Sequence, residues 1–143
     1  MFDRISIVNR STFDVETLNN LIGNKKCIID FWTTQCDQCP SALDELNYLA
    51  DQKAYENVKC IAICCDDIDE LLTGPGALPD VSRWPNLSHH MIGKESLSRM
   101  KRLGLKRVPY YVVTDEGEGR IYPLQPERDV VLQSERDMVP CTL

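Results

Sequence analysis

Residues 26–50 read KCIIDFWTTQCDQCPSALDELNYLA, and this stretch decides the fold. The apolar run from Cys27 to Trp32 predicts a buried strand. A short polar turn follows it and carries Cys36 and Cys39 in C-x-x-C spacing. The next residues have one apolar face at helical spacing, formed by Leu43, Leu46 and Leu49. The stretch therefore predicts a strand, a two-cysteine turn and a helix.

The length and composition indicate one soluble globular domain. The chain has 143 residues, of which 43% are hydrophobic and 27% are charged. We expect residues 1–143 to form a single domain. Residues 123–143 are expected either to add a helix over 127–138 or to form a loosely attached tail.

The net charge of -6 does not favour a nucleic-acid or anionic membrane partner. No apolar stretch approaches the length that spans a bilayer. The first ten residues, MFDRISIVNR, lack the pattern of a signal peptide. A cytoplasmic protein is therefore expected.

The chain contains seven cysteines, an odd number that does not suit an extracellular disulfide scaffold. Most of them are expected to be reduced thiols. Cys141 is the extra cysteine that can react, by regulatory or intermolecular pairing. Core packing is the expected role of Cys27, Cys60, Cys64 and Cys65.

A second unbroken apolar run, VKCIAICC over 58–65, predicts a central strand parallel to the first. The strand, helix and strand then form a right-handed βαβ unit. Catalytic groups of such units gather beyond the carboxyl ends of the strands, which is where the two cysteines lie.

Shorter elements are predicted around this unit. A strand is expected over 5–8, and a helix over 14–22 with Ser11 or Thr12 as its cap. The segment 66–85 is rich in Pro and Gly and is expected to be an ordered insertion with a helical turn near 68–72. A helix over 94–103 and a hairpin of strands 110–113 and 120–122 complete the chain.

The C-x-x-C spacing is compatible with several chemistries. A thiolate attacks disulfides, and a helix N-terminus stabilises its charge. On that interpretation Cys36 is the exposed attacking thiol and Cys39 resolves the mixed disulfide. The alternatives are two unrelated thiols or half of a zinc site. The strand–turn–helix context favours the redox interpretation.

No metal site is expected. A structural zinc site needs two more ligands in paired spacing. His89 and His90 are adjacent to each other, and Cys64 and Cys65 form a vicinal pair on a predicted strand. Neither arrangement fits.

Asp30 and Pro109 are each open to two interpretations. Asp30 interrupts an apolar strand, so it is either a proton acceptor for Cys39 or a strand-end carboxylate that reaches solvent or a backbone N–H. Pro109 marks either a strand boundary or a cis peptide bond beside the cysteines.

Three segments resemble the thioredoxin superfamily. IIDFWxxxCxxC (28–39) is similar to its active-site segment, and LGLKRVP (103–109) to the segment before its cis-proline. DEGEGRI (115–121) resembles the hairpin that follows. The long segment 66–85 resembles the tryparedoxin and nucleoredoxin branch.

This resemblance implies an α/β thioredoxin fold with a central mixed sheet flanked by helices on both faces. It also implies dithiol–disulfide exchange with protein disulfides, recharged by an unidentified reductase or dithiol donor. No cofactor, metal, nucleic acid or membrane is implied. The implied roles are nucleophile for Cys36, resolving thiol for Cys39, proton transfer for Asp30, substrate backbone contact for Val108, cis-proline for Pro109 and active-site aromatic for Trp32.

The sequence departs from the superfamily at the cysteine turn. Gln35 replaces the usual Trp, and Asp37 and Gln38 replace the usual residues between the cysteines. The charge of Asp37 opposes a thiolate, and Pro40 restricts the start of the helix. We therefore expect a less activated Cys36 and a relatively reducing couple. A binding or adaptor module, or a redox sensor with little turnover, is the alternative function.

Overall fold

A computed structural model describes residues 2–73, 78–114, 121–123 and 141–143. Within them the main sheet has seven strands in the order β2-β1-β5-β4-β3-β7-β8. The strands are β1 (Ser6–Asn9), β2 (Val15–Thr17), β3 (Lys26–Trp32), β4 (Val58–Cys64), β5 (Ser88–Ile92), β7 (Tyr110–Thr114) and β8 (Ile121–Pro123). A separate pair joins β6 (Arg107–Val108) and β9 (Cys141–Thr142). The helices are α1 (Leu18–Ile22), α2 (Cys39–Ala50), α3 (Ile68–Thr73) and α4 (Lys94–Arg102), with a 3-10 turn at Lys53–Tyr55.

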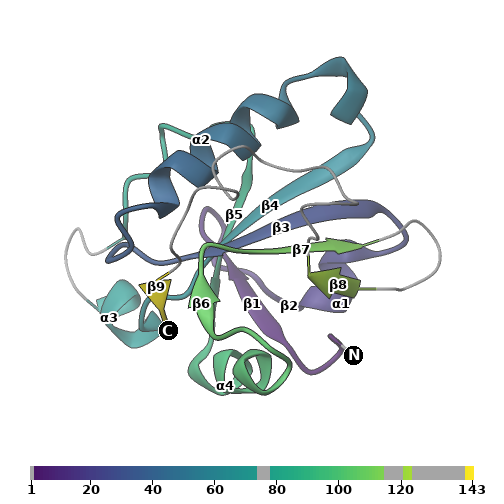
Figure 1. Cartoon of the computed structure of the whole chain (residues 1–143). Coiled ribbons are helices and arrows are strands. Elements are labelled where there is room, and N and C mark those ends of the chain that lie inside the picture. The colour runs from purple at the N-terminus through teal and green to yellow at the C-terminus, as the bar shows by residue number, and fades with distance from the viewer. Residues whose placement is uncertain (1, 74–77, 115–120, 124–140) are drawn as a thin grey trace.

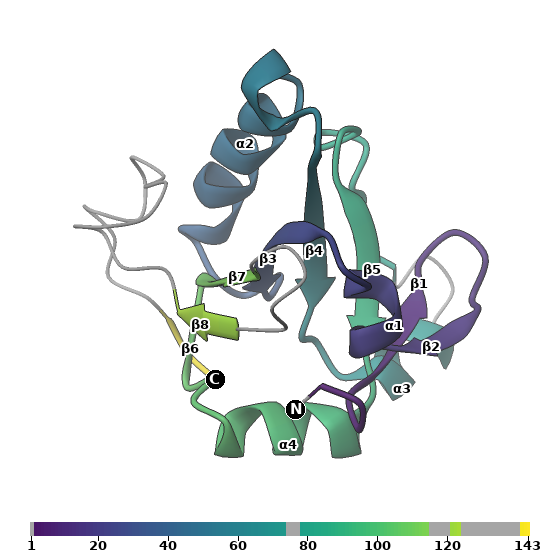
Figure 2. The same cartoon turned by 90° about the vertical axis from the view of Figure 1, so that its right-hand side faces the viewer.

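The helices lie on both faces of the sheet. Figures 1 and 2 show α2 on one face and α4 on the opposite face. Ser96 of α4 is buried, and its hydroxyl oxygen accepts a 2.8 Å hydrogen bond from the backbone N–H of Ser6 on β1. The predicted mixed sheet with helices on both faces is confirmed.

The two unbroken apolar runs form the centre of the sheet. β3 and β4 are parallel, and β7 pairs antiparallel with the other edge of β3. A strand covered on both faces must be apolar on both faces, and all residues of β3 after Lys26 are buried. The predicted βαβ unit of β3, α2 and β4 is confirmed.

The prediction for residues 14–22 was partly wrong. Only 18–22 form a helix, and Val15–Thr17 instead pair with β1. Its cap is Thr17, whose hydroxyl oxygen accepts a 3.1 Å bond from the N–H of Asn20. A Thr with extended backbone geometry is a good N-cap, so the helix begins one turn later than the charge pattern suggested.

One central strand was not predicted. β5 lies between β1 and β4, and it is parallel to β4. Its sequence, SHHMI, begins with polar residues and lacks the long apolar run that marks β3 and β4. The sheet context, rather than local propensity, makes this segment a strand.

The described parts of the 66–85 insertion are anchored to helices. The predicted turn near 68–72 is the helix α3. Lys94 of α4 forms ion pairs with Asp67 and Asp69 at 3.3 and 2.9 Å. Trp84 donates a 2.7 Å hydrogen bond from its indole N–H to Asp44 of α2.

The pairing of β7 with β8 confirms the predicted hairpin. Its turn over 115–120 and the helix suggested for 127–138 lie outside the described residues. In the described part of the chain, no helix is long and apolar enough to cross a membrane.

Candidate active site

The two C-x-x-C cysteines lie where β3 leads into α2. The first helical residue is Cys39, and Pro40 follows in the first turn. A proline there loses no helical hydrogen bond, because the first N–H groups have no partner within the helix. Pro40 therefore leaves Cys39 in the helix, and Cys36 stays in the preceding turn, where its N–H bonds the Thr33 carbonyl at 3.4 Å.

Cys36 is buried, contrary to the expectation that it is the exposed thiol. Its residue is 2% exposed. The thiol lies 3.7 Å from the backbone carbonyl oxygen of Val108, so it faces the loop before β7 instead of open solvent. This contact joins two segments that are 72 residues apart in sequence.

The Val108–Pro109 peptide bond is cis. This confirms the second of the two sequence interpretations of Pro109. Val108 is the last residue of β6, and β7 begins at Tyr110. The structure thus brings Val108 and Pro109 to the cysteine turn, as the resemblance implies.

Cys39 is held as a protonated thiol. Burial raises the pKa of Cys39 first, because a thiolate is poorly solvated there. Hydrogen bonding with Cys36 and the charge of Asp30 raise it further, while a bond with the Thr33 backbone lowers it. A protonated Cys39 needs a base before it can attack.

Asp30 is the buried carboxylate whose charge helps to raise the pKa of Cys39. It lies fully buried on β3, so the expectation of a strand-end residue reaching solvent was wrong. Its charge acts on Cys39 and also on Cys65. Burial next to a thiol that must lose a proton is the arrangement expected of a proton acceptor.

The cysteine turn is fixed to the end of β4 by Asp66. One carboxylate oxygen of Asp66 accepts a 3.1 Å hydrogen bond from the Thr34 backbone N–H, and the other accepts one from the Thr34 hydroxyl. These two hydrogen bonds form a clamp that ties the turn between β3 and α2 to the end of the neighbouring strand β4. On sequence alone, Asp66 is placed only at the start of the expected insertion, and this contact is not predicted.

Trp32 is buried beneath the insertion. Its ring meets Trp84 edge to face, with centroids 5.7 Å apart and the planes at 64°. Such edge-to-face pairs are stabilising beyond their buried area. Trp32 is 4% exposed and therefore packs within the core beside the site.

The other described cysteines serve the core. Cys27, Cys60, Cys64 and Cys65 are all buried. Burial raises the pKa of Cys60 to about 11 and that of Cys64 to about 12. These thiols carry no negative charge at neutral pH and are poor nucleophiles.

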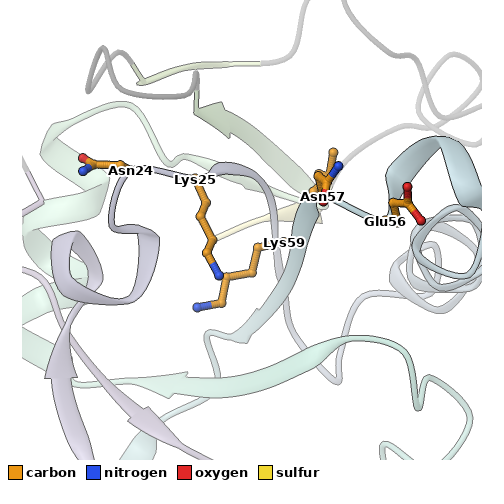
Figure 3. A pocket seen from close by; sticks show the side chains of 6 residues that line it. Asn24, Lys25, Glu56, Asn57 and Lys59 are labelled. Atoms are coloured by element: carbon orange, nitrogen blue, oxygen red, sulfur yellow. The ribbon is translucent and has the colours of Figure 1, made fainter.

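A separate hollow lies at the opposite end of β3 and β4. It has a volume of about 550 Å³, and Figure 3 shows Lys25 and Lys59 on one side of it and Glu56 on the other. Lys59 also donates a 2.9 Å bond to the Leu21 carbonyl. None of the residues that line it is a cysteine, so it is no part of the cysteine site. Across the described residues, no group of His, Cys, Asp or Glu could hold a metal ion.

Comparison with solved structures identifies the architecture. A secreted Mycobacterium tuberculosis disulfide oxidoreductase homologous to E. coli DsbE superposes with a TM-score of 0.61 at 18% identity, covering 92% of this chain and 90% of the other. A thioredoxin-like protein from Aeropyrum pernix gives 0.57 at 21% identity, with 92% and 84% covered. The dsbF protein of MTB, in mixed oxidized and reduced forms, gives 0.62 at 15% identity, with 84% and 82% covered.

The chain has the thioredoxin fold. At these identities the likeness is one of fold, and no family model and no curated protein sequence matches the chain. Within the thioredoxin fold, the contact between Cys36 and Val108 and the burial of Asp30 are features of this chain's own geometry.

Proposed function

We propose that the protein is a thiol–disulfide oxidoreductase that exchanges a Cys36–Cys39 dithiol with disulfides of other proteins. The observation that carries this proposal is the 3.7 Å approach of the Cys36 thiol to the carbonyl of Val108, next to the cis bond to Pro109. It places the first thiol of the pair beside the backbone of β6, which pairs with β9 in this structure. Extended peptides join strand edges of this kind by main-chain hydrogen bonds.

The exchange proceeds in two steps. The Cys36 thiolate attacks one sulfur of the substrate disulfide, forms a mixed disulfide, and releases the other sulfur as a thiolate that takes up a proton. Cys39 then gives its proton to Asp30 and attacks Cys36. The mixed disulfide breaks, a Cys36–Cys39 disulfide forms, and the second substrate thiol leaves.

The products balance as a two-electron reduction of the substrate. The oxidised protein then needs a separate reductase or dithiol donor to return to the dithiol form. Membership of the tryparedoxin or nucleoredoxin branch and a location in the cytoplasm, where such donors keep thiols reduced, both stay predictions.

Reduction of insulin disulfides with dithiothreitol tests the proposal. The unmodified protein is expected to accelerate it, and Cys36→Ala to abolish the acceleration. Cys60→Ala is the matched control, because Cys60 is also a buried thiol but lies outside the site.

A second assay separates turnover from binding. Cys39→Ser is expected to accumulate mixed disulfides on Cys36, since the resolving step is lost. An absence of both turnover and trapped species would refute the exchange reaction. That result would support the alternative of a binding module with the thioredoxin fold.

A further inference from the structure

A strand from the distal part of the chain occupies the edge next to the cysteine site. β9 pairs antiparallel with β6, so that Cys141 lies opposite Val108 and Thr142 opposite Arg107. The backbone N–H of Leu143 donates a further 2.8 Å bond to the Lys106 carbonyl. Figure 1 shows β9 alongside β6. The ladder thus fixes the register of this strand by backbone contacts.

Val108 connects two cysteines. Its carbonyl oxygen lies 3.7 Å from the Cys36 thiol, and its register partner across the ladder is Cys141. Residues directly opposite each other in an antiparallel pair have Cα atoms about 4.5–5.5 Å apart. Cys36 and Cys141 therefore flank the same residue from different segments of the chain.

The position of β9 is the one that an incoming peptide would take. Extended peptides add to exposed strand edges, and here the edge of β6 already carries a strand of the same chain. In that strand, the residue in register with Val108 is Cys141.

We propose that Cys141 is an internal exchange partner of the Cys36–Cys39 pair and forms a Cys36–Cys141 disulfide. This inference rests on the function proposed above. Cys141 loses its proton and attacks Cys36 in the Cys36–Cys39 disulfide. The Cys36–Cys39 bond breaks, the Cys36–Cys141 bond forms, and Cys39 leaves as a thiolate that takes up a proton. One thiol and one disulfide are present before and after, so no other oxidant is required.

The exchange is reversible. Attack by Cys39 on Cys36 restores the Cys36–Cys39 disulfide, and Cys141 leaves as a thiolate that takes up a proton. In the unmodified chain, Cys39 can attack Cys36 again, so the Cys36–Cys141 disulfide is transient. Removal of Cys39 makes that disulfide persistent.

The test therefore uses the full chain carrying Cys39→Ser, treated with glutathione disulfide at about 0.1 mM. The buffer also holds reduced glutathione at about 0.1 mM, because the ratio of the linked form to the Cys36–glutathione adduct is the effective concentration of Cys141 divided by that of reduced glutathione. Intramolecular partners act at effective concentrations on the order of millimolar, so the linked form should exceed the adduct by about tenfold. Proteolysis without reductant, followed by mass spectrometry, measures the two products. Cys39→Ser/Cys141→Ser should give only the adduct, and Cys39→Ser/Cys60→Ala should behave like Cys39→Ser.

A Cys36–glutathione adduct that persists in Cys39→Ser, with Cys141 unlinked to Cys36, would overturn the inference. The single variant Cys141→Ser separates this result from a failure of the proposed function. If that variant still reduces insulin and forms the Cys36–Cys39 disulfide, only the internal exchange is wrong. If Cys36 reacts with neither glutathione nor insulin, both proposals fail.

Discussion

The thiol of Cys36 lies 3.7 Å from the carbonyl oxygen of Val108, although the two residues belong to different halves of the chain. The contact is made because the antiparallel pairing of β7 with β3 returns the cis-proline loop to the carboxyl end of β3. Cys36 thus faces the backbone of β6 rather than open solvent. The reactivity of the site depends on groups around this contact that can be changed one at a time.

Asp30→Asn should slow turnover at pH 7 by tenfold or more, because Cys39 loses its proton acceptor. The substitution also removes a negative charge that raises the pKa of Cys39, so the lost rate should recover as pH increases. The pH profile of insulin reduction measures both effects. Asp51→Asn, at the far end of α2, is the control. An unchanged rate at pH 7 would exclude Asp30 from proton transfer.

Asp37→Asn should increase the rate at which Cys36 is alkylated, by roughly two- to fivefold at low ionic strength. Asp37 is exposed and adjacent in sequence to Cys36, so its charge disfavours the attacking thiolate. Iodoacetamide kinetics with peptide mapping report the rate at Cys36 alone. The gain should shrink in high salt, and a gain that does not depend on salt would contradict a charge effect.

Asp44 should matter more as a hydrogen-bond acceptor for Trp84 than as an ion-pair partner. Asp44→Ala leaves the buried indole N–H without its acceptor and should lower the free energy of unfolding by about 1–3 kcal/mol. Asp44→Asn keeps an acceptor oxygen and loses only the exposed ion pair with Arg83, which should cost less than about 1 kcal/mol. Urea denaturation compares the two variants. Equal losses would assign the effect to the ion pair.

His90 should make the protein less stable in mild acid. Burial lowers the pKa of His90 from 6.5 to about 4, with Lys59 and His89 adding to this and Glu16 opposing it. Between those values the unfolded chain binds a proton that the folded chain does not. Above pH 6.5 the ionisation of His90 therefore does not reduce the free energy of unfolding. As pH falls from 6.5 toward 4, it reduces that free energy by at most about 3 kcal/mol.

His90→Gln should flatten that part of the profile. Urea denaturation of both proteins at pH 7.5 and pH 4.5 gives the loss of unfolding free energy in acid for each. The other acid-sensitive groups are the same in both proteins, so the difference between the two losses reports His90. Identical pH dependence in the two proteins would show that His90 is not the responsible group.

Local sequence predicted the elements that are marked by an unbroken apolar run or by leucines at regular helical spacing. The apolar runs that became β3 and β4 and the leucine spacing of α2 each contain enough buried side chains to decide their structure. β5 could not be predicted, because SHHMI becomes a strand only through its pairing with β1 and β4. The late start of α1 reflects the pairing of 15–17 with β1, which competes with the helix.

The sequence indicated the residues of the candidate site but not how deeply they are buried. The motif identified Cys36, Cys39, Asp30 and Pro109, but it gave no sign that Cys36 would be buried. That burial comes from tertiary contacts, which spacing does not encode. The clamp of Thr34 by Asp66 depends likewise on where β4 ends in space.

A redox titration of the C-x-x-C pair tests the central claim most directly. The full chain is equilibrated in glutathione buffers of graded ratio, free thiols are blocked, and peptides are identified by mass spectrometry. The account predicts a Cys36–Cys39 disulfide that forms and disappears reversibly as a two-electron couple. Cys36 and Cys39 that stay reduced across the whole range, or that never pair with each other, would contradict it.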